Sequence, residues 1–407
     1  MQRHFNDWLD AYMDYTEDTE PARLYRKWVG VSTLAAVLQR KVWLPVGKVG
    51  TWYPNFFVIL VGPSGKARKG TAMGPGNKLL NDLEIPMASE SVTKEALIRN
   101  MAESSQTTMM EEENKPVLHS SLTIFSEELT VFLGYNNKEL MAYLTDWFDC
   151  KDHWTNETKT QGVDIIQGTW LNLLGATTPK LIRTTLPEDA VGGGFTSRVI
   201  FVFEENKDKT LTPWAINRDE KTYEKLKQDL EKIHTLVGQV SITPGFSDYF
   251  TDRYYEIDKH PPVDHPRFSG YNNRRAAHMV KLSMILNASR SGGLVLSKED
   301  LQRADTLLEQ TERKMPRTFH GTGTSEKSEV TSQIMTYIAQ SKSTTQQEIL
   351  QRFYQDLDGL DDLQQILQAL KMMSFVKTRV TGSSTKIVFN KDSEVSQTFI
   401  KKVQSNA

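Results

Sequence analysis

Cysteine is almost missing from this chain of 407 residues, in which Cys150 is the only one. A single cysteine excludes intrachain disulfides and cysteine-based zinc fingers. No apolar run reaches the roughly 18 residues that a membrane span requires. The N-terminus, MQRHFNDWLDAYMDY, also lacks the uninterrupted apolar segment of a signal peptide. We therefore expect a cytoplasmic protein without a membrane partner.

The chain also lacks an excess of either charge, since 49 lysines and arginines face 51 aspartates and glutamates. Any binding of nucleic acid must then come from a local basic surface and not from the overall charge. The 38% hydrophobic and 25% charged residues are typical of a globular protein. The length suffices for two or three domains with a sizeable core.

Five segments differ in their pattern. Residues 1–40 read as helical. In residues 41–210 strands alternate with helices, which predicts an α/β fold with a mostly parallel sheet. Residues 211–318 are mainly helical, and residues 319–329 have the composition of a linker. Residues 330–407 read as a compact helical unit that is followed by two short strands.

A glycine-rich loop follows an apolar strand in VILVGPSGKARKGTA, residues 58–72. It departs from the usual phosphate loop, G-x-x-x-x-G-K-[ST], because Arg68 precedes Lys69 and a glycine separates Lys69 from Thr71. Glycines let backbone N–H groups turn toward a phosphate, and the N-terminus of the next helix adds positive charge. We expect ATP here, with Thr71 holding Mg²⁺. The alternative is a glycine-rich turn with solvated lysines. The predicted nucleotide contacts in the loop are Gly62, Pro63, Ser64, Gly65, Arg68, Lys69, Gly70, Thr71 and Ala72.

A second apolar strand ends in acidic residues in LTIFSEEL. An ATPase needs a carboxylate at such a place to polarise the attacking water, and Glu127 is the natural base. Ser126 stands where aspartate is usual, so its metal binding would be weaker or indirect. The alternative is an exposed glutamate pair that caps a helix. The preceding stretch, MMEEENKPVLHS, is polar and predicts a loop.

The order of these features resembles that of the AAA+ ATPases. More narrowly, WYPNFFVILVGPSGKARKGTA and GGGFTSRVIFVFEE resemble a family of phage and mobile-element replication proteins, and the C-terminal layout is similar to that of minichromosome-maintenance helicases. The resemblance covers roughly residues 20–315. It implies a P-loop AAA+ core with a helical lid region, and a hexameric ring that binds ATP between subunits.

The resemblance also implies three further roles, for which five side chains are candidates. Thr177, or its neighbour Thr178, would be the sensor on the strand between the other two motifs. Arg198 would be the arginine finger that reaches the ATP of the neighbouring subunit. Lys69, Glu127 and Arg198 would then be the catalytic residues. Arg274, with Arg275 as the close alternative, would be the arginine of a sensor helix. The alternative for each arginine is a surface salt bridge.

A hairpin is predicted in HWTNETKTQGVDIIQG, just before the sensor strand. In the ring helicases that the chain resembles, a hairpin at this place grips DNA in the central channel. Lys151, His153 and Lys159 are the candidate phosphate contacts, with Trp154 as a stacking surface. The alternative is an ordinary surface hairpin whose Trp154 packs inward.

The tail reads as a winged helix, with three helices and two strands joined by a Gly-Ser turn. Lys377, Arg379 and Lys386 lie in the predicted wing and suit phosphate contacts. The third helix has few basic residues, so strong sequence-specific reading of the major groove is not indicated. The alternative is a winged helix that docks proteins or is purely structural.

These patterns favour an ATP-driven DNA helicase of a phage or mobile element, with single-stranded DNA in a central channel and a primase or other replication protein as a further partner. The first alternative is an origin-binding initiator or helicase loader without processive unwinding. The second is an adaptor with an inactive phosphate loop. A small-molecule kinase is disfavoured, because only the Lys-Gly-Thr ending of the loop, which resembles that of adenylate kinases, supports it.

Overall fold

The chain divides into two units, Met1–His320 and Gly321–Ala407, and each is described by itself. The computed structural model describes residues 3–48, 50–110, 115–158, 162–186, 192–212, 214, 219–290, 293–319, 326–354, 356–357, 359–381 and 384–404. Over these residues, no helix has both the length and the apolar character that crossing a membrane requires.

The larger unit is built around a five-stranded sheet in the order β4-β5-β8-β3-β9. Its strands are β4 (Ser105–Met110), β5 (Lys115–Ser126), β8 (Thr169–Thr177), β3 (Phe57–Val61) and β9 (Val199–Phe203). All neighbours run parallel except β4 and β5. The prediction of an α/β fold with a mostly parallel sheet is therefore confirmed.

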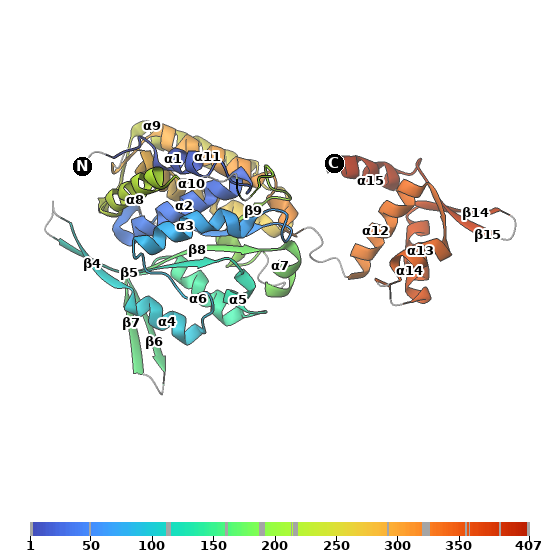
Figure 1. Cartoon of the computed structure of the whole chain (residues 1–407), viewed down its shortest axis with the longest axis horizontal. Coiled ribbons are helices and arrows are strands. Elements are labelled where there is room, and N and C mark those ends of the chain that lie inside the picture. The colour runs from blue at the N-terminus through green and yellow to red at the C-terminus, as the bar shows by residue number, and fades with distance from the viewer. Residues whose placement is uncertain are drawn as a thin grey trace. The chain divides into compact units, whose positions relative to one another are not determined.

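The central strands are buried because helices cover both faces of the sheet. Every residue of β3, β8 and β9 is buried, as the uninterrupted apolar runs predict for parallel strands. In Figure 1, α2 (Arg23–Leu38) and α3 (Lys69–Asp82) lie on one face, and α5 (Leu129–Leu133) and α6 (Lys138–Phe148) lie on the other.

Helices from both ends of the larger unit pack together on the side of α2, so the N-terminal helices and residues 211–318 belong to one compact body. Its other helices are α1 (Trp8–Tyr15), α4 (Lys94–Glu103), α7 (Pro179–Thr185), α8 (Glu220–His234), α9 (Pro244–Lys259), α10 (Ser269–Arg290) and α11 (Lys298–Glu312). Its shorter elements are β1 (Val42–Val46), β2 (Gly50–Trp52), β10 (Gly238–Gln239), β11 (Ser241–Ile242), β12 (Val295–Leu296), and the 3₁₀ segments η1 (Gln39–Lys41), η3 (Thr196–Arg198), η5 (Pro266–Phe268) and η6 (Met315–Phe319).

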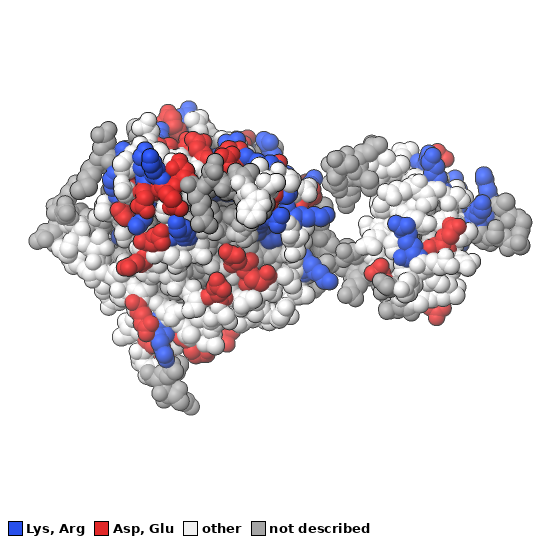
Figure 2. Space-filling model, viewed as in Figure 1, with Lys and Arg blue, Asp and Glu red and all other residues white. Residues whose placement is uncertain are grey.

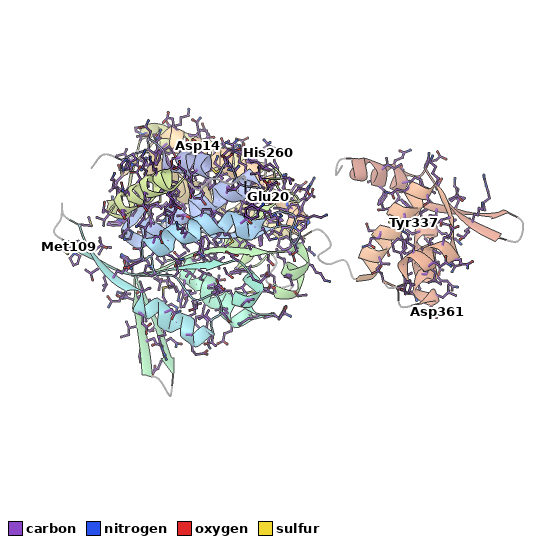
Figure 3. The ribbon with its side chains drawn as sticks, in the orientation of Figure 1. Asp14, Glu20, Met109, His260, Tyr337 and Asp361 are labelled. Carbon is purple, nitrogen blue, oxygen red and sulfur yellow. The ribbon has the colours of Figure 1, made fainter. Side chains whose placement is uncertain are left out.

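Two antiparallel arms extend from the larger unit in Figure 1. One is the hairpin of β6 (His153–Thr158) and β7 (Gly162–Gln167), as predicted. The other is formed by β4 and β5, and Met109, labelled in Figure 3, lies on its β4 side with 48% of its surface exposed. The loop expected at residues 109–120 is therefore wrong for Met109, Met110 and residues 115–120, because paired edge strands tolerate polar side chains on a solvated face.

The smaller unit has a core of its own, formed by apolar residues such as Ile334, Leu363 and Phe375. Its sheet has the order β13-β15-β14, with both pairs antiparallel. The three expected helices and two expected strands are present, and β13 and α15 were not expected. The elements are α12 (Glu326–Ser341), β13 (Ser343–Thr345), α13 (Gln346–Phe353), α14 (Leu360–Met372), β14 (Val376–Thr381), β15 (Ser384–Phe389) and α15 (Glu394–Gln404).

Candidate functional site

The glycine loop connects the buried strand β3 to α3, which begins at Lys69. The Lys69 ammonium turns back over the loop and donates hydrogen bonds to the carbonyl oxygens of Gly62, at 2.7 Å, and Pro63, at 3.4 Å. Burial lowers the pKa of Lys69, while the negative charge of Glu128 opposes that shift. The lysine thus lies within the loop, with backbone partners that a phosphate oxygen could replace.

Arg68 precedes this lysine in the left-handed conformation, with φ of 56° and ψ of 40°. Residues other than glycine rarely adopt this conformation. The usual motif therefore has a glycine at this position for a conformational reason, and Arg68 lacks that freedom. The Arg68 guanidinium pairs with the Glu20 carboxylate at 2.8 Å, and Lys207 binds the same carboxylate. Glu20 is labelled in Figure 3. Arg68 therefore contacts the N-terminal segment of its own chain.

Glu127 follows β5 and faces the first turn of α3. A Cβ atom built on Gly70 would lie 2.9 Å from Oε2 of Glu127, so the missing side chain of Gly70 leaves room for the carboxylate. Burial, and next the charge of Glu90, raise the pKa of Glu127. The structure thus brings the predicted base next to the predicted phosphate loop.

The hydroxyl groups expected to bind Mg²⁺ are less well placed. Gly70 occupies the helix position that faces Glu127, and Thr71 is one residue further, about 100° around the helix. Thr71 is exposed, whereas Ser126 is only 2% exposed at the end of β5. Over the described part of the chain, no three His, Cys, Asp or Glu residues group as a metal site. A magnesium ion here would depend on the nucleotide for most of its ligands.

Thr177 ends β8, which lies between β3 and β5, as expected for a sensor. It is 3% exposed, and its carbonyl oxygen accepts a hydrogen bond from the Gly62 N–H at 3.3 Å. The Thr178 hydroxyl instead accepts the N–H of Leu181 and caps α7. Of the two threonines, Thr177 is therefore the one beside the loop.

Arg198 lies at the opposite end of the sheet. It precedes β9, whose first residue pairs with Phe57 at the start of β3, whereas Lys69 follows the end of β3. A strand of five residues spans about 16 Å. Arg198 is 6% exposed and donates to Oδ2 of Asp149 at 2.6 Å and to the carbonyl oxygen of Gly194 at 2.7 Å. No sequence motif marks Asp149, which lies 49 residues before Arg198.

The two arginines of the expected sensor helix differ sharply. Arg274 has a 39% exposed side chain, and its guanidinium lies 3.9 Å from the Asp149 carboxylate, on the same edge as Arg198. Arg275 is fully buried and pairs with Asp305 and with Glu312, the latter at 2.9 Å. A nucleotide contact by Arg275 would take from Glu312 its guanidinium partner and from Asp305 one of two arginines, the other being Arg253 at 2.7 Å. The geometry therefore favours Arg274.

The β6–β7 hairpin offers little positive charge along its described arms. Trp154 donates to Asp146 at 2.9 Å and packs its ring on Tyr143 and Trp147, so it packs inward and is not a stacking surface for DNA. Lys151 is also paired with Asp146. His153 is exposed, and Lys159 lies outside the described residues.

The β14–β15 hairpin of the smaller unit presents one basic face. Lys377 and Arg379 are two residues apart on β14 and point to the same side, and Arg379 pairs directly with Lys386 on β15. All three side chains are exposed, and blue lysine and arginine atoms are visible on this unit in Figure 2. Opposed like charges repel each other in the free protein, and an anion would relieve that repulsion.

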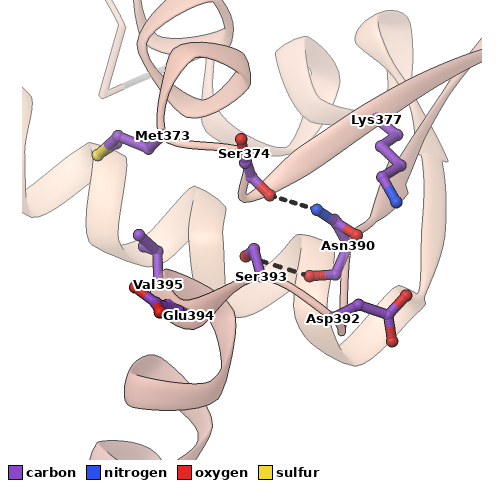
Figure 4. A pocket seen from close by; sticks show the side chains of 8 residues that line it. All are labelled: Met373, Ser374, Lys377, Asn390, Asp392, Ser393, Glu394 and Val395. Carbon is purple, nitrogen blue, oxygen red and sulfur yellow. Dashed lines mark hydrogen bonds between the residues drawn. The ribbon is translucent and has the colours of Figure 1, made fainter.

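A pocket of about 480 Å³ lies at the root of this hairpin (Figure 4). Asn390 donates to the carbonyl oxygen of Ser374 at 2.7 Å, and Lys377 lies on the same side of the pocket as Asn390 in Figure 4. Asp392 and Glu394 line the same pocket. Because these two acids offset Lys377, the pocket itself is not a phosphate site.

A scan against models of known protein families finds no match, and a search of curated proteins finds no significant relative. The resemblance to AAA+ ATPases therefore depends on the motifs and on the geometry described above.

Proposed function

We propose that this chain is an ATP-driven DNA helicase or translocase with an AAA+ core and a C-terminal winged helix. It would act as a ring, most simply a hexamer, in the replication of a phage or mobile element within a bacterial cytoplasm. The proposal is supported by one observation, the separation of the candidate side chains between the two edges of the sheet. Lys69, Glu127 and Thr177 gather at the carboxyl ends of the parallel strands, and Arg198 and Arg274 gather at the amino ends.

This separation supports an ATP site shared between subunits. Arg198 is about one strand length, roughly 16 Å, from the loop of its own chain, which is too far for a guanidinium to reach. A finger on that edge can act only on a neighbouring subunit, as the ring model requires. In the single chain, Asp149 holds the Arg198 guanidinium in place near the surface.

The loop and the acidic residues suit the binding and hydrolysis of ATP. When bound, ATP with Mg²⁺ would supply the phosphoryl group that is transferred and the charges that attract the charged side chains of the site. Lys69 would exchange its carbonyl partners for phosphate oxygens. Glu127 would accept a proton from water, and its raised pKa brings it nearer to the working pH of a general base.

The smaller unit suits a winged helix that contacts phosphates. Its elements follow the order helix, strand, two helices and two strands before α15. The basic face of Lys377, Arg379 and Lys386 lies on the hairpin that would form the wing. We expect it to contribute to binding through the DNA backbone and not through base edges.

The test is DNA-stimulated ATP hydrolysis by the full chain. Lys69→Ala should abolish hydrolysis, and Glu127→Gln should lower it by about 10²- to 10⁴-fold while ATP still binds. Glu103→Gln is the matched control, since Glu103 is exposed at the end of α4, and it should leave hydrolysis unchanged. Absence of DNA-stimulated hydrolysis in the wild type, or strand separation that survives Lys69→Ala, would contradict the proposal.

One observation favours the initiator or loader as the second candidate. The described arms of the β6–β7 hairpin carry Glu157 and Asp164 but no lysine or arginine. A weak grip on a single strand suits a protein that assembles on duplex DNA through its smaller unit. Slow hydrolysis with ATP-dependent assembly on DNA and no unwinding would select this function.

A further inference from the structure

Arg40 is a nearly buried arginine for which the nucleotide site has no use. It belongs to η1, directly after α2, and its side chain is 8% exposed. Its guanidinium lies over the ring of Tyr53, 4.4 Å from the centroid, and donates to the carbonyl oxygen of Cys150 at 3.0 Å. Its Nε atom has no hydrogen-bond partner among the described residues. The guanidinium is therefore held in a fixed orientation with a spare donor.

This guanidinium lies at the root of the β6–β7 hairpin. Asp152 immediately precedes β6 and Gly168 immediately follows β7, and the N–H of Gly168 donates to the Asp152 carbonyl oxygen at 2.7 Å. A Cβ atom on Gly168 would lie 2.8 Å from Nη1 of Arg40, and Gly168 has φ of +59°. A glycine at this turn thus makes room for the arginine beneath the hairpin.

The two partners of the ion pair between Arg40 and Asp152 differ in exposure, since Arg40 is nearly buried and Asp152 is exposed. The one carboxylate partner of Arg40 among the described residues is Asp152, with Oδ1 at 2.5 Å, and the side chain of Asp152 is 80% exposed. Asp152 can therefore swing into solvent, whereas Tyr53 and the Cys150 carbonyl still hold the arginine. A phosphodiester offers the same pair of anionic oxygens as a carboxylate and suits the planar fork of arginine.

Arg40 itself makes the root of the hairpin more basic than its arms, since Lys151 beside it is already paired with Asp146. Lys41 follows Arg40 directly, but its buried ammonium bonds Nδ1 and the carbonyl oxygen of His234 at the end of α8, so it does not add to the charge at the root. Lys151 lies between the two residues that contact Arg40, Cys150 and Asp152. A nucleic-acid backbone that approaches the hairpin would meet attraction at the root and repulsion along the acidic arms.

We propose that Arg40 forms a phosphate-binding subsite for a nucleic-acid backbone at the root of the β6–β7 hairpin, and that the Asp152 carboxylate takes the place of the phosphate in the free protein. This proposal rests on the DNA binding of the proposed function and adds a contact site to it. A strand would bind by displacing the Asp152 side chain from the guanidinium.

The test measures binding of a labelled single-stranded oligonucleotide by fluorescence anisotropy over a range of salt concentrations. Asp152→Asn should tighten binding by about fivefold, because it removes the competing surface ion pair. Glu157→Gln is the matched control, with the same charge change on an exposed residue of the same hairpin, and should have less than half that effect. Arg40→Gln should weaken binding and lower the slope of log K against log[salt] by about 0.7, the value for one single-strand phosphate contact.

A double variant and a free anion sharpen the result. In the Arg40→Gln background, Asp152→Asn should no longer tighten binding more than Glu157→Gln does. Inorganic phosphate should compete with the oligonucleotide more strongly in Asp152→Asn than in Glu157→Gln. Phosphate that binds at Arg40 without displacing the oligonucleotide would overturn the assignment to a nucleic-acid backbone.

Different results would refute the proposed function and the Arg40 subsite. If the wild type binds no DNA, the proposed function falls and this subsite falls with it. If the wild type binds DNA but Asp152→Asn and Glu157→Gln behave alike, only the subsite is refuted. Should Arg40→Gln fail to fold, the comparison of the two exposed residues still decides.

Discussion

Replacing Arg68 by glycine should cost less stability than replacing it by alanine if the loop has the conformation described here. Arg68 has φ of 56°, and this left-handed conformation costs a residue other than glycine about 1–2 kcal/mol. Arg68→Gly relieves that cost, loses a partly exposed ion pair worth about 0.2–1 kcal/mol, and adds about 0.5–1 kcal/mol of chain entropy to the unfolded state. The net change in the free energy of unfolding should therefore be within about 1 kcal/mol of zero.

Arg68→Ala keeps the strained backbone and loses the same ion pair with Glu20. We expect it to be about 1 kcal/mol less stable than Arg68→Gly, the reverse of the order of alanine and glycine in a helix interior. Urea unfolding followed by tryptophan fluorescence measures this difference in the full chain. All eight tryptophans lie between Trp8 and Trp214, so the signal reports the larger unit alone. If alanine equals or exceeds glycine in stability, the left-handed conformation of residue 68 is wrong.

Three further predictions concern Arg274 and Arg275, His119, and Gly70. Arg275→Gln should lower the free energy of unfolding by about 3–5 kcal/mol, because the buried Glu312 carboxylate loses its guanidinium partner and Asp305 loses one of its two arginines. Arg274→Gln should change that free energy by less than about 1 kcal/mol and slow ATP hydrolysis. The reverse pattern in denaturation and turnover assays would make Arg275 the sensor. Burial lowers the pKa of His119 to about 4, below its ordinary value near 6.5. The stability that neutral His119 provides is complete above pH 6.5 and is lost, by about 3 kcal/mol, as the pH falls toward 4. In urea titrations, His119→Gln should therefore reduce the loss of stability over that pH range. An unchanged loss would exclude His119 as its cause. Gly70→Ser would place its Cβ 2.9 Å from Oε2 of Glu127, so it should displace the carboxylate and slow ATP hydrolysis while ATP still binds, and an unchanged turnover would show that the reaction does not need Glu127 in this position.

The sequence predicts the parts of the site that depend on local patterns. Apolar runs mark β3, β8 and β9, and the turn from β3 into α3 follows from the glycines beside Lys69. Glu127 was predicted from its place after an apolar strand. This strand pairs with β8, which follows it by more than 40 residues. The resemblance to AAA+ ATPases implies such a pairing, whereas the periodicity of the sequence does not.

The rest depends on contacts that leave no local pattern. Asp149 and Arg198 are 49 residues apart, and Arg40 and Asp152 are 112 residues apart. Neither pair has a spacing that indicates contact before the sheet is assembled. Trp154 in an otherwise polar hairpin could face either side, and only the position of α6 beneath it decides that it packs inward.

The central claim is that Lys69 of one chain and Arg198 of its neighbour complete one ATP site. The most direct measurement mixes Lys69→Ala chains with Arg198→Ala chains, each inactive alone, and follows DNA-stimulated ATP hydrolysis. With random assembly into rings, about one quarter of the interfaces would combine an intact Lys69 with an intact Arg198, so the mixture should regain activity. A mixture that stays as inactive as its components, although the chains assemble together, would contradict a site shared between subunits.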